Sequence, residues 1–376
     1  MKFVLFYHSL VSDWNHGNSH FLRGVVSELL DRGHAVDVYE PADGWSRTHL
    51  LADAGQAALE DFKAAFPTLS SRQYSLTDLD LDAALDAADA VIVHEWNSPE
   101  LIAQVGQRAS ASGCKILFHD THHRSVSEPE AMATLDLRDY DGVLAFGETV
   151  AARYLAEGWA QRAWVWHEAA DTRCFRPQPE VQRRADLIWV GNWGDDERSG
   201  ELCEYLIDPV QRLGLHATIH GVRYPQHALK LLEQANITYG GWLANHRVAH
   251  EFARHRCTVH VPRRAYAEQL RGVPTIRMFE ALACGIPLVS APWDDCESLF
   301  RPGVDYLVAA HGRQMDRHLR DILNDPALAA GLAENGLETI RSRHTCAHRV
   351  NELMQILFQL KAGTQRTAPE LEEMRA

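Results

Sequence analysis

Residues 257–292 read CTVHVPRRAYAEQLRGVPTIRMFEALACGIPLVSAP, and this stretch predicts a strand, a helix and a second strand in succession. Gly272 and Pro274 open the predicted helix, because proline is favoured close to a helix start. Gly285 closes it, at the position just past the end where glycine is preferred. The helix N-terminus then lies at the carboxyl edge of the preceding strand. Free backbone N–H groups and the helix dipole gather there, so the stretch predicts a site for an anion such as a diphosphate.

Arg277 and Glu280 stand three positions apart on this helix, away from the apolar face that contains Phe279 and Leu282. A carboxylate so placed can accept two hydrogen bonds from the vicinal hydroxyls of a nucleotide ribose. The alternative is an intrahelical ion pair on a solvated face. The residue types alone leave both interpretations open.

Short apolar runs alternate with amphipathic stretches along most of the chain, which predicts βαβ units and parallel sheets. The runs before residue 170 lie at 2–8, 35–40, 90–95, 114–120, 142–147 and 163–168. Those after residue 180 lie at 186–191, 216–221, 236–241, 257–262, 286–291 and 305–309. The pattern predicts an α/β protein in which a Rossmann-like architecture occurs twice.

The stretch 172–185 is rich in proline and arginine and predicts the linker between the two series. We therefore expect two Rossmann-like domains, 1–170 and 171–345, that face each other across a cleft. Residues 346–362 carry apolar positions at helical spacing and predict a helix that crosses back onto the domains. Residues 363–376 are mostly polar and predict a disordered tail.

The chain has 376 residues and a formal net charge of −14. Non-specific attraction to nucleic acid depends on clustered positive charge, so no nucleic-acid partner is expected. The sequence has no apolar run of about 18 residues, and its first residues have neither the core nor the cleavage site of a signal peptide. We expect a cytoplasmic protein without a membrane span.

The sequence HDTHHR places His119, His122 and His123 after an apolar run, at the carboxyl edge of the first predicted sheet. Their spacing fits no zinc motif, and the seven cysteines include no C-x-x-C pair. The acidic groups 195–197 and 294–295 are more simply explained as residues of helix starts. Neither a metal site nor a cofactor is predicted.

The stretch FEALACGIPLV (279–289) resembles the donor-binding motif of the two-domain retaining glycosyltransferases of group 1, family 4. Other stretches resemble the same superfamily and occur in its order: HGNSHFLRGVVSELLDRGHAVDVYEP (16–41), HEAADTRCFRP (167–177) and WVGNWGDDERSGE (189–201). The segments GNWGDDER (191–198) and IRMFEALACG (276–285) most resemble those of the CgeB-like spore-maturation glycosyltransferases. The resemblance implies a GT-B fold and a nucleotide-sugar donor.

The resemblance also implies roles for single residues. In that family a glutamate matching Glu280 binds the ribose of the donor. A first glutamate, eight positions earlier, approaches the donor sugar, and Gly272 stands in its place here. The candidates to take over its contact are the backbone N–H groups of Gly272 and Val273 or the side chains of Arg263, Arg264 or Arg271.

Arg198 falls close to the family's phosphate-binding lysine, in the same loop as Asn192. Arg198 and one of Arg263, Arg264 or Arg271 are the candidates to neutralise the departing diphosphate without a metal, and Arg277 and Asn192 are further candidates for donor binding. The glycine-containing turn at Gly17 and Asn18 matches the family's first loop, where the backbone approaches the substrates.

His119 is similar to a family histidine that touches the donor sugar. His94 ends another strand at the same edge and is a candidate general base for an acceptor hydroxyl if the reaction inverts configuration. Capping of a neighbouring helix is the alternative.

Trp242 lies in a stretch similar to the family loop that contacts the nucleobase, and it is a candidate for stacking on that nucleobase. Simple packing is the alternative, since the chain has ten tryptophans.

The sequence thus predicts an enzyme, a metal-independent glycosyltransferase that moves a sugar from a nucleotide diphosphate to a hydroxyl of a glycan, a protein or a small molecule, with a retaining mechanism favoured. One alternative is a nucleotide-sugar epimerase on the same fold. Another is a non-catalytic nucleotide-sugar-binding protein, since Gly272 replaces the family's glutamate. The sequence does not determine the base, the sugar, the acceptor, the stereochemistry or the oligomeric state.

Overall fold

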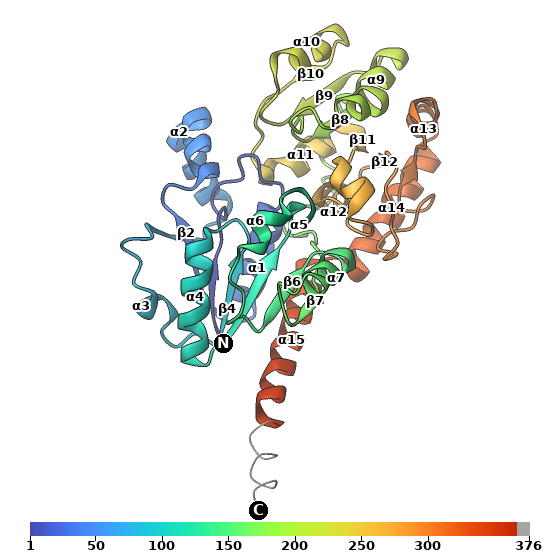
Figure 1. The fold of residues 1–376 in the computed structure, drawn as a ribbon. Coiled ribbons are helices and arrows are strands. Elements are labelled where there is room, and N and C mark those ends of the chain that lie inside the picture. The colour runs from blue at the N-terminus through green and yellow to red at the C-terminus, as the bar shows by residue number, and fades with distance from the viewer. Residues whose placement is uncertain (367–376) are drawn as a thin grey trace, which may run out of the picture.

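The computed structural model describes residues 1–366, which form two α/β domains and a long C-terminal helix (Figure 1). In the described residues the first sheet has the strand order β3-β2-β1-β4-β5-β6-β7 and the second β10-β9-β8-β11-β12-β13. The paired strands of both sheets are parallel. Both sheets follow the doubly wound order, so the predicted pair of Rossmann-like domains is confirmed.

The first domain alternates strands with helices. Its elements are β1 (Lys2–Phe6), α1 (Ser19–Asp31), β2 (Ala35–Pro41), α2 (Trp45–Ala65), β3 (Arg72–Tyr74), α3 (Leu81–Leu85), β4 (Ala90–His94), α4 (Pro99–Ser112), β5 (Lys115–Asp120), α5 (Arg124–Ser127), α6 (Pro129–Ala133), β6 (Gly142–Ala145), α7 (Glu148–Ala156) and β7 (Ala163–Val165). The six predicted strands are all present. The edge strand β3 is an addition, because its residues RQY have no apolar alternation and become a strand by pairing with β2.

The second domain repeats the pattern, and each of its six predicted strands is present. Its elements, followed by the C-terminal helices, are β8 (Ala185–Val190), α8 (Ser199–Leu202), η1 (Cys203–Ile207), α9 (Asp208–Leu213), β9 (Ala217–His220), α10 (Gln226–Gln234), β10 (Thr238–Tyr239), η2 (Asn245–Arg247), α11 (Val248–Ala253), β11 (His255–His260), η3 (Ala265–Gln269), α12 (Ile276–Ala283), β12 (Leu288–Ser290), β13 (Leu307–Val308), α13 (Gly312–Asn324), α14 (Pro326–Arg343) and α15 (Cys346–Arg366).

The C-terminal helix α15 packs against α1 of the first domain, with Val350, Leu353 and Leu357 buried (Figure 1). This confirms the predicted return. The helix continues through Arg366, four residues beyond its predicted end at 362. One glycine costs only about 1 kcal/mol in a helix, and Gly363 therefore does not end it. The remaining part of the predicted tail, 367–376, lies outside the described residues.

The domains meet over an apolar core that both of them share. Phe21 of α1, Phe175 of the linker and Phe279 of α12 belong to one buried cluster. The chain order reverses between β1 and β4 in one sheet and between β8 and β11 in the other. Ligands of doubly wound proteins bind outside the carboxyl ends of strands at such switch points.

Candidate active site

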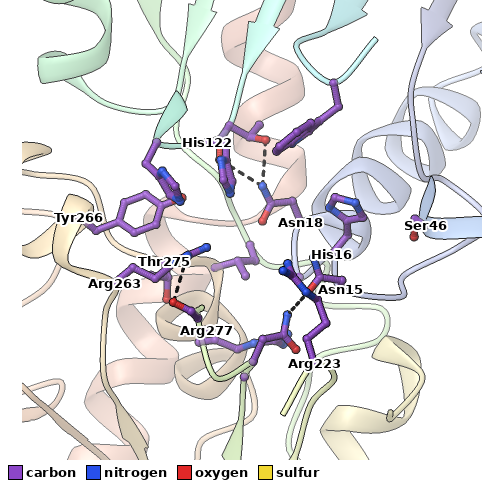
Figure 2. A pocket seen from close by; sticks show the side chains of 18 of the residues that line it. Asn15, His16, Asn18, Ser46, His122, Arg223, Arg263, Tyr266, Thr275 and Arg277 are labelled. Carbon is purple, nitrogen blue, oxygen red and sulfur yellow. Dashed lines mark hydrogen bonds between the residues drawn. The ribbon is translucent and has the colours of Figure 1, made fainter. Parts of the chain in front are cut away.

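A cavity of 770 Å³ lies between the domains, at the carboxyl ends of the strands that flank both switch points. Figure 2 shows Asn18 and His122 approaching it from the first domain, and Arg263, Thr275 and Arg277 from the second. Sites for small molecules have volumes of roughly 300–1,000 Å³. The cavity therefore has the size and the place of a ligand site.

The N-terminus of α12 opens onto this cavity. The helix begins after Thr275, whose hydroxyl lies 3.0 Å from Nε2 of His260 and does not cap the helix. Thr275, Ile276 and Arg277 all line the cavity. The backbone N–H groups of a first turn have no partner within the helix, and the helix dipole adds positive potential. This end of the cavity therefore favours an anion.

Arg198 supplies a buried positive charge to the same wall. Its guanidinium donates to the backbone oxygens of Asn192 and Val261, both at 2.5 Å. Burial, and then the nearby Arg263, lower the pKa of Arg198 to about 10, so the group stays charged at neutral pH. Among the described residues, no carboxylate lies within ion-pair distance of this guanidinium. Backbone oxygens satisfy its N–H groups without neutralising its charge, so this wall of the cavity is electropositive.

Arg263 also lines the cavity, but Glu197 lies 2.6 Å from its Nε and partly neutralises it. Arg264 and Arg271 are exposed, are paired with carboxylates outside the cavity wall, and do not contribute to it. Of the three arginines that the sequence leaves as alternatives, only Arg263 is at the cavity.

Asn192 lies where the two domains touch. Its Nδ2 donates to Oδ1 of Asn15 at 2.5 Å, and its Oδ1 accepts from the backbone N–H of Val222 at 2.8 Å. The side chain thus joins the loop after β1 to the loop after β9, and it lines the cavity between them. A ligand that enters here meets both domains at this residue.

Glu280 is fully buried behind the cavity wall. Its Oε1 accepts hydrogen bonds from Nδ1 of His20 at 2.8 Å and Nδ2 of Asn245 at 2.9 Å, and its Oε2 pairs with Arg277. Burial alone would raise the pKa of this carboxyl, but Arg277 and then His20 outweigh burial and hold that pKa below its usual value.

The ion pair expected as an alternative for Arg277 and Glu280 is therefore present, but on a buried face instead of a solvated one. Arg277 and Asn245 line a smaller, 50 Å³ cavity that adjoins the main one. A ribose there would reach Glu280 by replacing one of its present donors, and the ribose role stays a prediction.

Gly272 and Val273 do not reach the cavity wall. Their N–H groups donate to the carbonyl oxygens of Asp294 at 2.7 Å and Leu270 at 3.2 Å. A Cβ added to Gly272 would come within 2.5 Å of Oε1 of Glu297, and φ at Gly272 is +81°. The backbone contacts with a donor that the sequence suggests here are therefore not available in this structure.

His119 and His94 are fully buried at the carboxyl edge of the first sheet and lie behind the cavity wall. Both ring nitrogens of His119 lack a partner, and its ring lies 4.8 Å from that of Trp166. Burial lowers the pKa of His119 to about 3. Nε2 of His94 lies 3.0 Å from the Thr121 hydroxyl. The structure therefore places neither ring where it touches a ligand in the cavity, and their predicted roles stay untested.

Gly17 and Asn18 line the cavity from the turn after β1. A Cβ added to Gly17 would come 2.8 Å from the side chain of Ile276, so glycine allows this turn to approach α12. Trp242 lines the smaller cavity and donates its indole N–H to Oδ1 of Asp13 at 3.1 Å. The position suits contact with a base and also ties the second domain to the first.

Sequence reasoning missed several residues of the wall, namely His8, His16, Trp45, Trp96 and Glu168. Nε2 of His8 lies 3.2 Å from Nδ1 of His16. Trp45 and Trp96 expose 46% and 37% of their surface, an unusual degree for tryptophan. A signal did exist for His8, which follows a strand at the carboxyl edge. The tryptophans have no local pattern that marks them.

No helix within the described part of the chain is long and apolar enough to cross a membrane. The same residues contain no cluster of three or more histidine, cysteine, aspartate or glutamate side chains suited to a metal ion.

Residues 198–355 match the model of a family described as glycosyl transferase-like. This stretch contains Arg198, α12 and the loops between them. The match confirms the enzyme class that the sequence predicts, a glycosyltransferase. Among curated proteins, none matches the chain in sequence.

Several solved structures share the fold over nearly the whole chain. Sucrose-phosphate synthase from Thermosynechococcus elongatus is 14% identical, with a TM-score of 0.67, covering 96% of this chain and 100% of that one. HepE from Anabaena, in complex with UDP-glucose, gives the same identity, coverage and TM-score. An α-glucosyltransferase in complex with UDP and a 13-mer DNA containing an HMU base is 12% identical, with a TM-score of 0.68 and coverage of 95% and 99%. The chain therefore has the GT-B fold, and its residues 198–355 are glycosyl transferase-like in sequence.

Proposed function

We propose that this protein is a metal-independent glycosyltransferase that binds a UDP-sugar between its domains and transfers the sugar to an acceptor hydroxyl. The observation that carries the proposal is the buried Arg198 guanidinium, which has no carboxylate partner and lies at the same cavity as the N-terminus of α12. Together they form a site for a diphosphate. UDP is proposed as the nucleotide because HepE and the α-glucosyltransferase are described in complex with UDP-glucose and UDP.

The nucleoside of this donor is placed on the side of the smaller cavity, which at 50 Å³ has to widen to take it up. Gly221, Val222 and Trp242 line it, and Asn245 connects it to Glu280. With the diphosphate at α12, the uracil would lie against Trp242 and the ribose near Glu280. This arrangement places the nucleoside on the second domain and leaves the larger cavity for the sugar and the acceptor.

The acceptor is proposed to bind on the first-domain side. Trp45 and Trp96 present exposed rings there, with His16 between them at 6.2 Å from each ring. Aromatic rings with one apolar face and one wet edge suit partly polar ligands such as glycans. Closure of the domains over both substrates would exclude water and limit hydrolysis of the donor.

When the bond to the sugar breaks, negative charge grows on the departing UDP. Arg198, Arg263 and the N–H groups of α12 would stabilise that charge without a metal. The proposed reaction retains the configuration at the anomeric carbon of the sugar, as the sequence favours. NMR of the product's anomeric proton tests this outcome.

We also propose that the chain belongs with the CgeB-like enzymes, because its segments GNWGDDER and IRMFEALACG resemble theirs.

A binding and turnover assay tests the proposal. UDP should raise the melting temperature of the protein in the presence of EDTA, and more than GDP, dTDP or CMP do, because ligands of the folded state stabilise it. UDP release from UDP-glucose should rise when glycans are added. Conversion of the UDP-sugar to its epimer without an acceptor would favour the epimerase alternative, and binding without turnover the non-catalytic one. No response to any of the nucleotides would contradict the proposal.

Glu280→Gln should abolish the preference of the protein for a complete ribose. The wild-type protein is expected to bind UDP about tenfold or more tightly than 2′,3′-dideoxy-UDP, because hydrogen bonds to a charged group contribute about 1.5–3 kcal/mol each. The glutamine variant should bind both ligands with similar affinity in calorimetric titrations. A variant that keeps the wild-type preference would remove Glu280 from the ribose site.

A further inference from the structure

Glu168 is a carboxyl group at the cavity that the donor site described above does not use. It lies in the segment that follows β7, is only 3% exposed, and forms part of the cavity wall. Its Oε1 is buried without a hydrogen-bond partner. Within the described residues, neither oxygen of this carboxyl takes part in a hydrogen bond or an ion pair that would explain its burial.

Buried polar groups in proteins almost always have partners, and an exception calls for an explanation. Burial raises the pKa of Glu168 well above its usual value, and the negative charge of Glu280 adds to this effect, while Arg277 opposes it. The nearby Glu280 has three donors, whereas Glu168 has none. The contrast indicates that the partner of Glu168 comes from outside the chain.

The position of Glu168 indicates which part of a ligand that partner is. Arg277 lines both cavities, at the junction where the diphosphate is placed. Trp242 and Asn245 line only the smaller cavity, on the nucleoside side. Glu168 and Tyr266 line only the larger one. A group attached to the outer phosphate would therefore enter the larger cavity, whose wall includes Glu168.

We propose that Glu168 binds hydroxyl groups of the sugar that is transferred, and so provides the carboxyl that the segment around Gly272 lacks. The inference rests on the proposed function, because it takes the diphosphate to lie at α12. A sugar ring carries adjacent hydroxyls that both donate and accept, and a carboxyl group in either protonation state can pair with them. The segment after β7 thus contributes directly to recognition of the donor sugar.

The experiment compares UDP with UDP-glucose, UDP-galactose and UDP-N-acetylglucosamine in calorimetric titrations. Glu168→Ala should leave the Kd of UDP within about twofold of the wild-type value. For the sugar that the wild-type protein prefers, it should weaken binding of the UDP-sugar relative to binding of UDP by at least about tenfold. Glu168→Gln keeps the size of the side chain and one acceptor oxygen, so it should restore part of that preference.

The exposed Glu157 on the first domain is the matched control, and Glu157→Ala should bind all four ligands as the wild-type protein does. An unchanged preference for the UDP-sugar in both Glu168 variants overturns the sugar contact while UDP binding still supports the proposed function. Equal losses for UDP and UDP-sugar assign Glu168 a structural role and also overturn the inference. Failure of the wild-type protein to bind UDP overturns the proposed function first.

Discussion

Arg198→Gln is expected to weaken binding of UDP by at least about 100-fold, which corresponds to about 2.8 kcal/mol. Removing one partner of a buried, hydrogen-bonded charge pair typically costs 2–5 kcal/mol or more, about the range needed. Among residues 1–366, the guanidinium hydrogen-bonds to backbone oxygens and lies over the Trp189 ring, and no carboxylate pairs with it, so the diphosphate would be an anionic partner for it. Calorimetric titration with UDP measures the effect.

Two comparisons separate the anion site from general effects of charge and folding. Arg264→Gln removes the same charge from a neighbouring but exposed position and should leave the affinity within about twofold. Arg198→Lys keeps the charge but loses the planar fork, so its affinity should fall between those of the wild type and the glutamine variant. If Arg264→Gln weakens binding as strongly as Arg198→Gln does, net charge and not the cavity would explain the effect.

Uridine provides a further check, because it has no phosphate. Its affinity should be nearly the same for the wild-type protein and Arg198→Gln if the arginine acts on the diphosphate. A large loss for uridine would show that the loop from Asn192 to Arg198 has moved, since Arg198 also holds the backbone oxygen of Asn192.

Much of the fold was predictable because it depends on local patterns. The alternation of apolar runs and helical stretches predicts both Rossmann-like domains, and glycine and proline mark the bounds of α12 to within a few residues. Strand β3 escaped prediction because three residues paired at a sheet edge leave no periodic signal. The end of α15 was misjudged because a single glycine does not stop a helix.

The candidate site was predictable only where a residue follows an element that the sequence defines. Arg198 and Asn18 were found in this way, and both line the cavity. The burial of Glu280 was not foreseen, because His20, its partner in the first domain, is far away in sequence. Glu168 was missed for a similar reason: its isolation depends on which side chains the two domains bring around it.

The buried His119 should make the free energy of unfolding depend on pH. Burial lowers the pKa of this histidine from 6.5 to about 3 in the folded protein, so the folded state binds a proton less readily than the unfolded chain does. The stability that depends on the neutral ring is therefore fully present above pH 6.5 and is lost as the pH falls below that value. Between pH 7.5 and 5.5 this single histidine should cost the wild-type protein about 1.4 kcal/mol.

His119→Leu should remove this cost, because leucine has a similar volume and no proton to bind. At pH 7.5 the variant should be within about 1 kcal/mol of the wild type, since two unpaired ring nitrogens are replaced by an apolar group. At pH 5.5 its free energy of unfolding should have gained about 1.4 kcal/mol relative to the wild type. Urea unfolding at both pH values measures the difference. Because His119 lies behind the cavity wall, the variant should also keep its affinity for UDP-glucose, and a loss of that affinity would instead support a contact with the donor sugar.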